Sequence, residues 1–294
     1  MTSGAHSAFE GFRGVDLGSD LKLPHVLSAV IAALMTAQAA LGRLLEGQYR
    51  DVAWIRATWF GNDLVTLLLA VPLLVTALVL VRRGSVRALI LWLGLLGYSA
   101  YNYAYYMLGA ALNAFFPLYV LLLILSVVTL ILVVSRIAAS QIAASLRAQT
   151  PVRVIGGYFI FVAASLSLAW FGMWAAYVFA GRPTPVEPEA FKLVAALDTS
   201  IMVSLMGFGG VLLWRRNAWG GIVAGLAGIQ GSLYLIVLSV NASVAISRSL
   251  VEAPGELPVW GGLAVTTVTA TAALLRGFRA PGPLDRRASQ SRPA

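Results

Sequence analysis

Residues 88–118 read ALILWLGLLGYSAYNYAYYMLGAALNAFFPL and decide the fold class. About 20 residues of helix, at ~1.5 Å each, cover the ~30 Å hydrocarbon core of a bilayer, so this apolar stretch is long enough to cross one. The basic residues Arg82, Arg83 and Arg87 precede it, and five tyrosines and Asn102 lie in its second half. We therefore expect a membrane-spanning helix that carries polar groups inside the bilayer and has other helices packed around it.

The composition excludes a soluble protein and several kinds of site. Hydrophobic residues make up 59% of the 294 residues, charged residues make up 11%, and the mean hydropathy is +0.83. A soluble domain carries about 25% charged residues. The absence of cysteine excludes disulfides, thiolate metal sites and cysteine nucleophiles. Both histidines, His6 and His25, lie near the N-terminus, which argues against a bis-histidine haem in the membrane, so we expect no cofactor and no metal.

Apolar segments of membrane-spanning length recur along the whole chain. They cover residues 24–45, 61–81, 88–110, 115–135, 154–180, 198–214, 219–245 and 258–276. This pattern predicts an all-α, polytopic membrane helix bundle with about eight transmembrane helices. An alternative interpretation of the first segment is a cleaved signal peptide, with Ala37-Gln38-Ala39 as its small-residue site.

The basic residues predict the orientation of these segments. If residues 1–23 form a cytoplasmic tail, fifteen of the 21 Lys and Arg residues fall on the cytoplasmic side. The other six are Arg43, Arg50, Arg56, Arg182, Lys192 and Arg248. By the positive-inside rule, both termini are expected in the cytoplasm of a bacterial inner membrane. Because the net charge of +9 is distributed in clusters between apolar segments, we expect the bilayer as partner and no nucleic acid.

Two apolar segments look alike, which suggests an internal repeat. Residues 62–84 read NDLVTLLLAVPLLVTALVLVRRG and residues 197–217 read LDTSIMVSLMGFGGVLLWRRN. Each begins with an aspartate at the outer face, Asp63 or Asp198, and ends with an Arg-Arg pair at the inner face. Parallel repeats of this kind occur in transporters. The alternative is that the positive-inside rule and helix capping produce the same pattern without a duplication.

The repeat hypothesis divides the chain into parts. It predicts two parallel four-helix units, residues 24–135 and residues 154–276, joined by a cytoplasmic connector of residues 136–153. Residues 277–294 then form a basic cytoplasmic tail. The connector is rich in alanine, favours a helix on the inner leaflet, and is ended by Pro151.

Short motifs in these segments are similar to those of a bacterial family of multi-pass membrane proteins that has no assigned activity. The motifs are Val81-Arg82-Arg83-Gly84-Ser85, Leu91-Trp92-Leu93-Gly94, Gly97-Tyr98, Tyr101-Asn102-Tyr103, Leu197-Asp198-Thr199 and Trp214-Arg215-Arg216. The resemblance implies a multi-pass membrane fold and implies no particular activity.

Polar residues near the middle of the membrane are the first candidates for a site. Tyr98 lies about 16 Å of helix beyond Arg87, near the midplane, and shares one helical face with Tyr101 and Asn102. A buried amide needs a partner, so Asn102 either joins two helices or contributes to a substrate site. Tyr105, Tyr106, Phe115 and Phe116 lie at headgroup depth and are expected to form an aromatic belt.

A second set of polar residues lies in the segment 219–245. Gln230 is near the midplane, and Tyr234 follows four residues later on the same helical face. We expect Gln230 to face Asn102 and to bond it directly or through water. Gly221 and Gly225 form a GxxxG motif that favours close approach of another helix.

Asp63 and Asp198 are the two carboxylates closest to the apolar segments. Both are good N-cap residues, and the helix dipole favours a negative charge at that position. The functional alternative is a cation or proton site, because acidic residues at membrane edges line ion pathways.

The sequence favours a protein that binds or transports a small solute or ion. The site is expected between the two halves, lined by Tyr98, Asn102, Gln230 and Tyr234. The alternative is a sensor or a subunit of a membrane complex without transport. An enzyme is disfavoured, because the mid-membrane positions offer amides and phenols rather than a general base or a nucleophile.

The predicted orientation can be checked with reporter fusions. A reporter fused after Arg216 should be cytoplasmic, and one fused at Glu187 should be external, because of the distribution of Lys and Arg. The opposite result at either point would overturn the eight-segment arrangement.

Overall fold

The structure is a computed structural model that describes residues 21–250 and 255–279, and these residues form helices along most of their length. The first part contains α1 (Lys22–Leu44), η2 (Glu46–Gln48), α2 (Ala53–Val65), the π-helical η3 (Thr66–Ala70), α3 (Val71–Val81), α4 (Val86–Gly109) and α5 (Phe116–Val134). The second part contains α6 (Ala139–Ala144), α7 (Val152–Ala180), α8 (Pro188–Leu197), the π-helical η4 (Asp198–Val203), α9 (Ser204–Trp214), α10 (Gly220–Ser247) and α11 (Leu257–Gly277).

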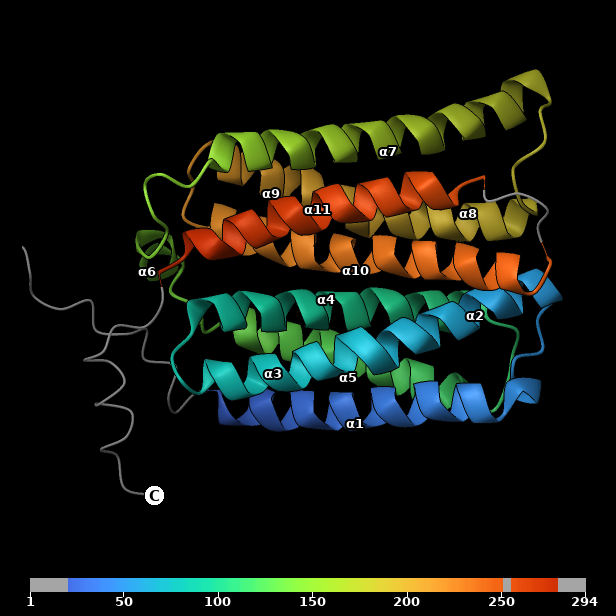
Figure 1. The fold of residues 1–294 in the computed structure, drawn as a ribbon, viewed down its shortest axis with the longest axis horizontal. Helices are drawn as coiled ribbons and strands as arrows, with labels where there is room; N and C mark the ends of the chain where they lie inside the picture. Colours follow the sequence, from blue (N-terminus) through green and yellow to red (C-terminus); the bar gives the residue numbers. More distant parts are fainter. Residues whose placement is uncertain (1–20, 251–254, 280–294) are drawn as a thin grey trace, which may run out of the picture.

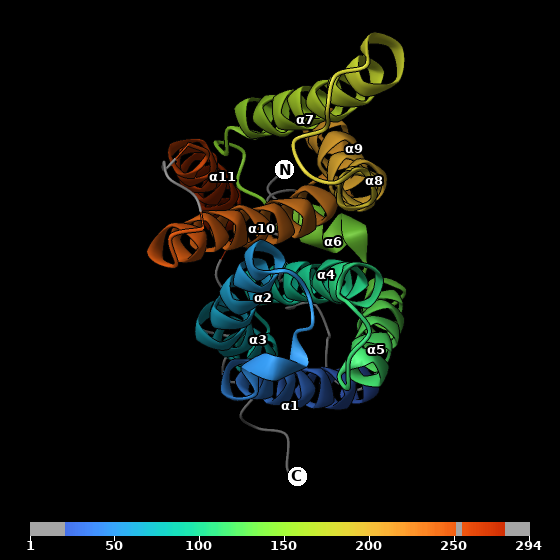
Figure 2. The same ribbon diagram turned by 90° about the vertical axis from the view of Figure 1, so that its right-hand side faces the viewer.

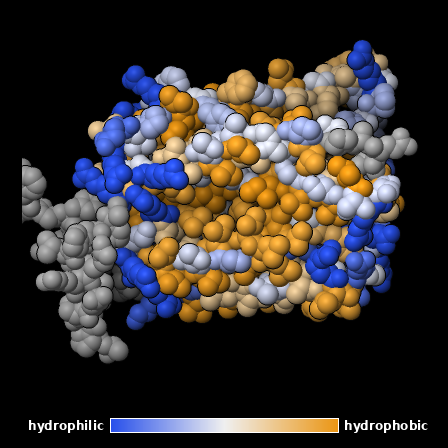
Figure 3. Space-filling model, in the orientation of Figure 1, coloured by the Kyte–Doolittle hydropathy of each residue, from blue (hydrophilic) through white to orange (hydrophobic). Residues whose placement is uncertain are grey.

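The long helices run side by side between two polar ends, and the surface between these ends is apolar (Figure 1, Figure 3). Seven helical segments of the described residues are long and apolar enough to cross a membrane, with α2–α3 and α8–α9 each counted as one. The prediction of an all-α polytopic membrane bundle is therefore confirmed. The helix α4 is not among the seven, because its tyrosines and Asn102 lower its hydropathy. Its 24 residues nevertheless run along the bundle as the eighth long segment.

The helices form two groups when viewed from the end (Figure 2). The first group contains α1, α2–α3, α4 and α5, and the second contains α7, α8–α9, α10 and α11. The helix α10 joins them, because it packs against both α2 and α4. The two predicted four-helix repeats remain a prediction, since grouping in space does not show a duplication.

Glycines allow α10 to approach the first group closely. A methyl group at Gly94 of α4 would overlap Ile229 of α10, and one at Gly225 of α10 would overlap Ile90 of α4. In the predicted GxxxG motif, only Gly225 faces α4, because Gly221 lies against the ring of Phe278. The close approach between the groups therefore uses glycines from both helices.

Two helices begin earlier than the sequence suggested. The segments predicted at 61–81 and 198–214 start at Ala53 and Pro188 in the structure. Proline suits the first turn of a helix, where its missing N–H is not needed. Each of these segments contains a π-helical stretch, and Pro72 lies two residues after the end of the first one. Proline has no backbone N–H to donate, so the α-helical hydrogen bonding is interrupted near Pro72.

The contact at Gly94 provides a test of the packing between the groups. Gly94→Ala should destabilise the protein by about 1–3 kcal/mol, because the added methyl group cannot be accommodated without shifting Ile229. Gly172→Ala is the matched control, since Gly172 lies in α7 and has no neighbouring atom within 4 Å of an added Cβ. Thermal unfolding in detergent measures both. Equal melting temperatures for the two variants would contradict the close contact.

Candidate functional site

Asp63 is buried in the first group and accepts three hydrogen bonds. The hydroxyl of Tyr49, from the loop after η2, donates to Oδ2 over 2.7 Å. The hydroxyl of Tyr106, from α4, donates to Oδ1 over 2.8 Å, and Nε2 of Gln38, from α1, donates to the same oxygen over 3.2 Å. Three separate segments therefore converge on one carboxylate, and all three donors are uncharged.

Further polar groups extend this cluster. Nε2 of Gln38 also donates to the Tyr49 hydroxyl over 3.0 Å, and Oε1 of Gln38 accepts from the Tyr103 hydroxyl over 3.0 Å. Burial and the negative charge of Asp63 raise the pKa of Tyr49 well above its ordinary value of 10.0, so this phenol keeps its proton and remains a donor. Gly42 provides space, because a methyl group there would overlap both Asp63 and Tyr49.

Asp198 is buried in the second group with an equivalent set of donors. The hydroxyl of Tyr101, from α4, donates to Oδ1. The hydroxyl of Tyr234, from α10, donates to Oδ2 over 3.0 Å, and Nε1 of Trp170, from α7, donates to Oδ2 over 3.1 Å. The structure therefore joins three predicted site residues, Tyr101, Asp198 and Tyr234, in one cluster.

The two clusters have the same composition and related positions. Each contains one carboxylate, two phenols and one N–H donor, and each carboxylate lies within three residues of a π-helical segment. Tyr106 and Tyr234 each follow a buried amide residue, Asn102 or Gln230, by four positions. Short π-helical insertions in α-helices are frequent at functional sites.

The expectation that the two aspartates cap helices is wrong. Asp63 lies in the last turn of α2, and Asp198 continues directly from α8, so each lies inside a longer helical segment. The helices begin about ten residues earlier, at Ala53 and Pro188. The side chains of the aspartates accept bonds from other helices rather than from their own first turn.

Of the two predicted bonds between Asn102 and Gln230, the direct one is wrong, whereas the one through water stays a prediction. Oδ1 of Asn102 accepts a long hydrogen bond of 3.4 Å from Nδ2 of Asn62, whose amide in turn lies 3.1 Å from that of Asn241. Gln230 is 1% exposed, and neither polar atom of its amide has a partner among the described residues. It faces α4 at Gly97.

The remaining aromatic expectations differ in outcome. Tyr98 is buried, and its hydroxyl lies 3.5 Å from that of Thr66 and bonds neither carboxylate. Tyr106 and Phe115 were expected in an aromatic belt, but both are buried. The carboxylate of Asp63 explains the position of Tyr106, because a phenol inside the bundle finds an acceptor there.

No basic residue forms an ion pair with either carboxylate within the described ranges. The ion pairs found there are Lys192–Glu189 at 2.5 Å and Arg248–Glu46 at 3.5 Å, and all four side chains are partly or largely exposed. The same ranges contain no group of three or more His, Cys, Asp or Glu residues that could hold a metal ion. The hydrogen bonds that Asp63 and Asp198 accept therefore all come from uncharged side chains.

Sequence reasoning missed four residues that bond the carboxylates: Gln38, Tyr49, Trp170 and Tyr106, the last of which was assigned to the aromatic belt. Gln38 gave a usable signal, because a glutamine in the middle of an apolar helix needs a polar partner. Tyr49 and Trp170 gave none, since aromatic residues near membrane surfaces are common.

Comparison with known proteins adds no relative. No protein-family model matches the chain, and no curated protein or solved structure matches it significantly.

The cluster around Asp198 can be tested with a double-mutant cycle. Asp198→Asn and Tyr234→Phe should each destabilise the protein by about 1–3 kcal/mol, the range for hydrogen bonds to charged groups and for buried partners left unpaired. Their effects should be non-additive, because the two side chains share one hydrogen bond. Tyr106→Phe is the control and should combine additively with Asp198→Asn, since Tyr106 bonds Asp63. Unfolding in detergent measures the parent, the three single variants and the two double variants, and equal coupling in both pairs would contradict the two separate clusters.

Proposed function

We propose that this integral membrane protein transports a small ion, and that the ion is a proton carried by Asp63 and Asp198. Ionisable residues inside a membrane are costly and commonly mark ion and proton pathways. Both carboxylates are almost fully buried, at 0% and 1% exposure, within long helices of the bundle. This pair of buried, unpaired carboxylates is the observation that supports the proposal.

The surroundings of the carboxylates favour an ion over a larger solute. The rings of Trp59 and Tyr106 stack with centroids 4.8 Å apart beside Asp63, and those of Tyr101 and Tyr234 lie 5.3 Å apart beside Asp198. The surface groove between α1 and α3 and the pocket beside α6 are not lined by either aspartate. A solute of several atoms would have to displace these packed rings.

The donor sets favour a proton over a metal cation. A metal cation needs several oxygen lone pairs directed at it, whereas each carboxylate here is surrounded by O–H and N–H groups that direct hydrogens at it. The indole N–H of Trp170 can only donate. A proton needs a single acceptor, and a tyrosine hydroxyl can rotate from donor to acceptor when the carboxylate is protonated.

The proposed membrane is the bacterial cytoplasmic membrane, with both chain ends on the cytoplasmic side. The α3–α4 turn, α6, the α9–α10 turn and the end of α11 lie at the same end of the bundle (Figure 1). Most of the described basic residues that were predicted on the cytoplasmic side lie in or beside these segments. A duplication that placed an aspartate in each half would account for the two matched clusters.

The alternative, a subunit without transport, has one observation in its favour. The outer part of α7 exposes large apolar side chains on more than one face, including Leu168 at 76% and Phe179 at 77%. A partner helix could cover this surface, as could lipid. The transport experiment below separates the two functions.

The proposal is tested by proton flux in proteoliposomes that contain a pH-sensitive dye. The purified protein should dissipate an imposed pH gradient faster than protein-free vesicles, and the rate should not depend on sodium or potassium. Asp63→Asn and Asp198→Asn should each reduce the flux at least tenfold, because an amide cannot carry the proton. Asp51→Asn is the control, since Asp51 lies in the outer loop and bonds Trp59 and Ala111 there.

Two results would contradict the proposal. Flux no greater than in empty vesicles would favour the subunit. Flux that persists in both aspartate variants, with each shown to be folded by its melting curve, would mean that the carboxylates do not carry the ion.

A further inference from the structure

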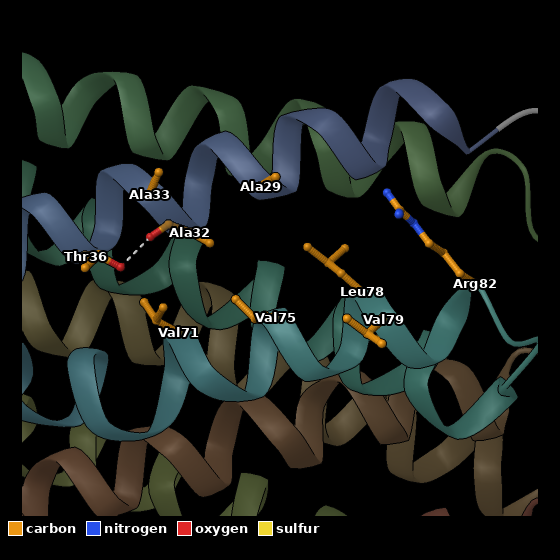
Figure 4. A pocket seen from close by; sticks show the side chains of 9 residues that line it. All are labelled: Ala29, Ala32, Ala33, Thr36, Val71, Val75, Leu78, Val79 and Arg82. Carbon is orange, nitrogen blue, oxygen red and sulfur yellow. Dashed lines mark hydrogen bonds between the residues drawn. The ribbon is translucent and has the colours of Figure 1, made fainter.

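A groove of about 400 Å³ lies between α1 and α3 on the outside of the bundle (Figure 4). Its lining residues are Ala29, Ala32, Ala33, Thr36, Val71, Val75, Leu78, Val79 and Arg82. One wall belongs to α1 and the other to α3, and the described residues leave the groove open to the surroundings of the protein. This surface lies in the apolar band, so the groove faces the lipid.

The α1 wall is hollow because its side chains are small. Positions 29, 32, 33 and 36 recur at helical spacing and lie on one face, and none carries a large side chain. The hydroxyl of Thr36 donates to the carbonyl of Ala32 over 2.8 Å, so it is directed back into its own helix. The opposite wall consists of valine and leucine side chains. The groove therefore suits an unbranched hydrocarbon chain.

One end of the groove carries a positive charge. Arg82 directly follows α3, is exposed, and forms no ion pair among the described residues. From Val71 to Arg82 the helix rises about 16 Å, which is close to half of the ~30 Å hydrocarbon core. The groove thus extends through about one leaflet and ends at headgroup depth beside a guanidinium group.

We propose that this groove binds an anionic phospholipid of the leaflet on the Arg82 side. One acyl chain lies between α1 and α3, and the phosphate contacts Arg82. A guanidinium group binds phosphate oxygens with paired hydrogen bonds, which provides the charge complementarity. A transmembrane helix does not suit the groove, because a helix with side chains is about 10 Å wide and contributes no anion at this position.

The test is native mass spectrometry of the whole protein, released from nanodiscs that contain phosphatidylglycerol and phosphatidylcholine with identical acyl chains. The protein should retain phosphatidylglycerol about fivefold over phosphatidylcholine, the scale of one basic residue at an anionic surface. Arg82→Gln should remove this preference. Ala29→Leu combined with Ala33→Leu should remove retention of both lipids, because the leucines fill the groove.

Two controls accompany these variants. Ala37→Leu enlarges an exposed side chain of α1 that lies outside the groove. Arg136→Gln removes a basic residue just after the end of α5. Both should retain lipid like the parent protein, and melting curves establish that every variant is folded. An unchanged preference in Arg82→Gln, or unchanged retention in the filled groove, would overturn the proposal. A change of oligomeric state in the filled variant would also overturn it, because a second copy of the chain would then occupy the groove.

Discussion

The structure depends on two tyrosine hydroxyls of α4 that donate to two buried carboxylates. Tyr106 bonds Asp63 in the first group of helices, and Tyr101 bonds Asp198 in the second. A carboxylate removed from water is strongly destabilising unless hydrogen-bond donors surround it. Since Tyr101 and Tyr106 are five residues apart on one helix, the position of α4 is constrained from both sides. Both groups of helices are therefore positioned relative to α4 by these two hydrogen bonds.

This constraint explains why a long helix that carries five tyrosines and Asn102 is largely buried inside the bundle. The tyrosines and Asn102 would be costly in contact with lipid, whereas inside the bundle they find acceptors and donors on neighbouring helices. Close approach of α10 is needed to cover α4, and the contacts at Gly94 and Gly225 allow it. The polar side chains of α4 therefore require its burial, and its burial requires the close glycine contacts with α10.

Periodicity and composition predicted the architecture because the bilayer imposes it on any apolar segment of sufficient length. They also identified Asp63, Tyr101, Asp198 and Tyr234 as candidate site residues. They did not predict the hydrogen-bond partners, because a donor such as Trp170 on α7 is related to Asp198 only through the packing of helices. Capping was predicted because local sequence cannot show that α2 and α8 begin before the apolar segments do. The pairing of Asn102 with Asn62 likewise depends on the position of α2 against α4.

The two clusters, although alike in composition, differ in the origin of their donors. Asp63 receives all three bonds from the first group, through Gln38, Tyr49 and Tyr106. Asp198 receives two bonds from its own group and one, from Tyr101, across the boundary between the groups. A displacement of the second group relative to α4 would break the bond of Tyr101 and leave the donors of Asp63 in place. In a protein that alternates between two arrangements of its halves, the negative charge of Asp198 would lose a donor in one of them, whereas that of Asp63 would not. Under the proposed proton transport, this asymmetry would couple the proton affinity of Asp198, and not that of Asp63, to such a movement between the groups.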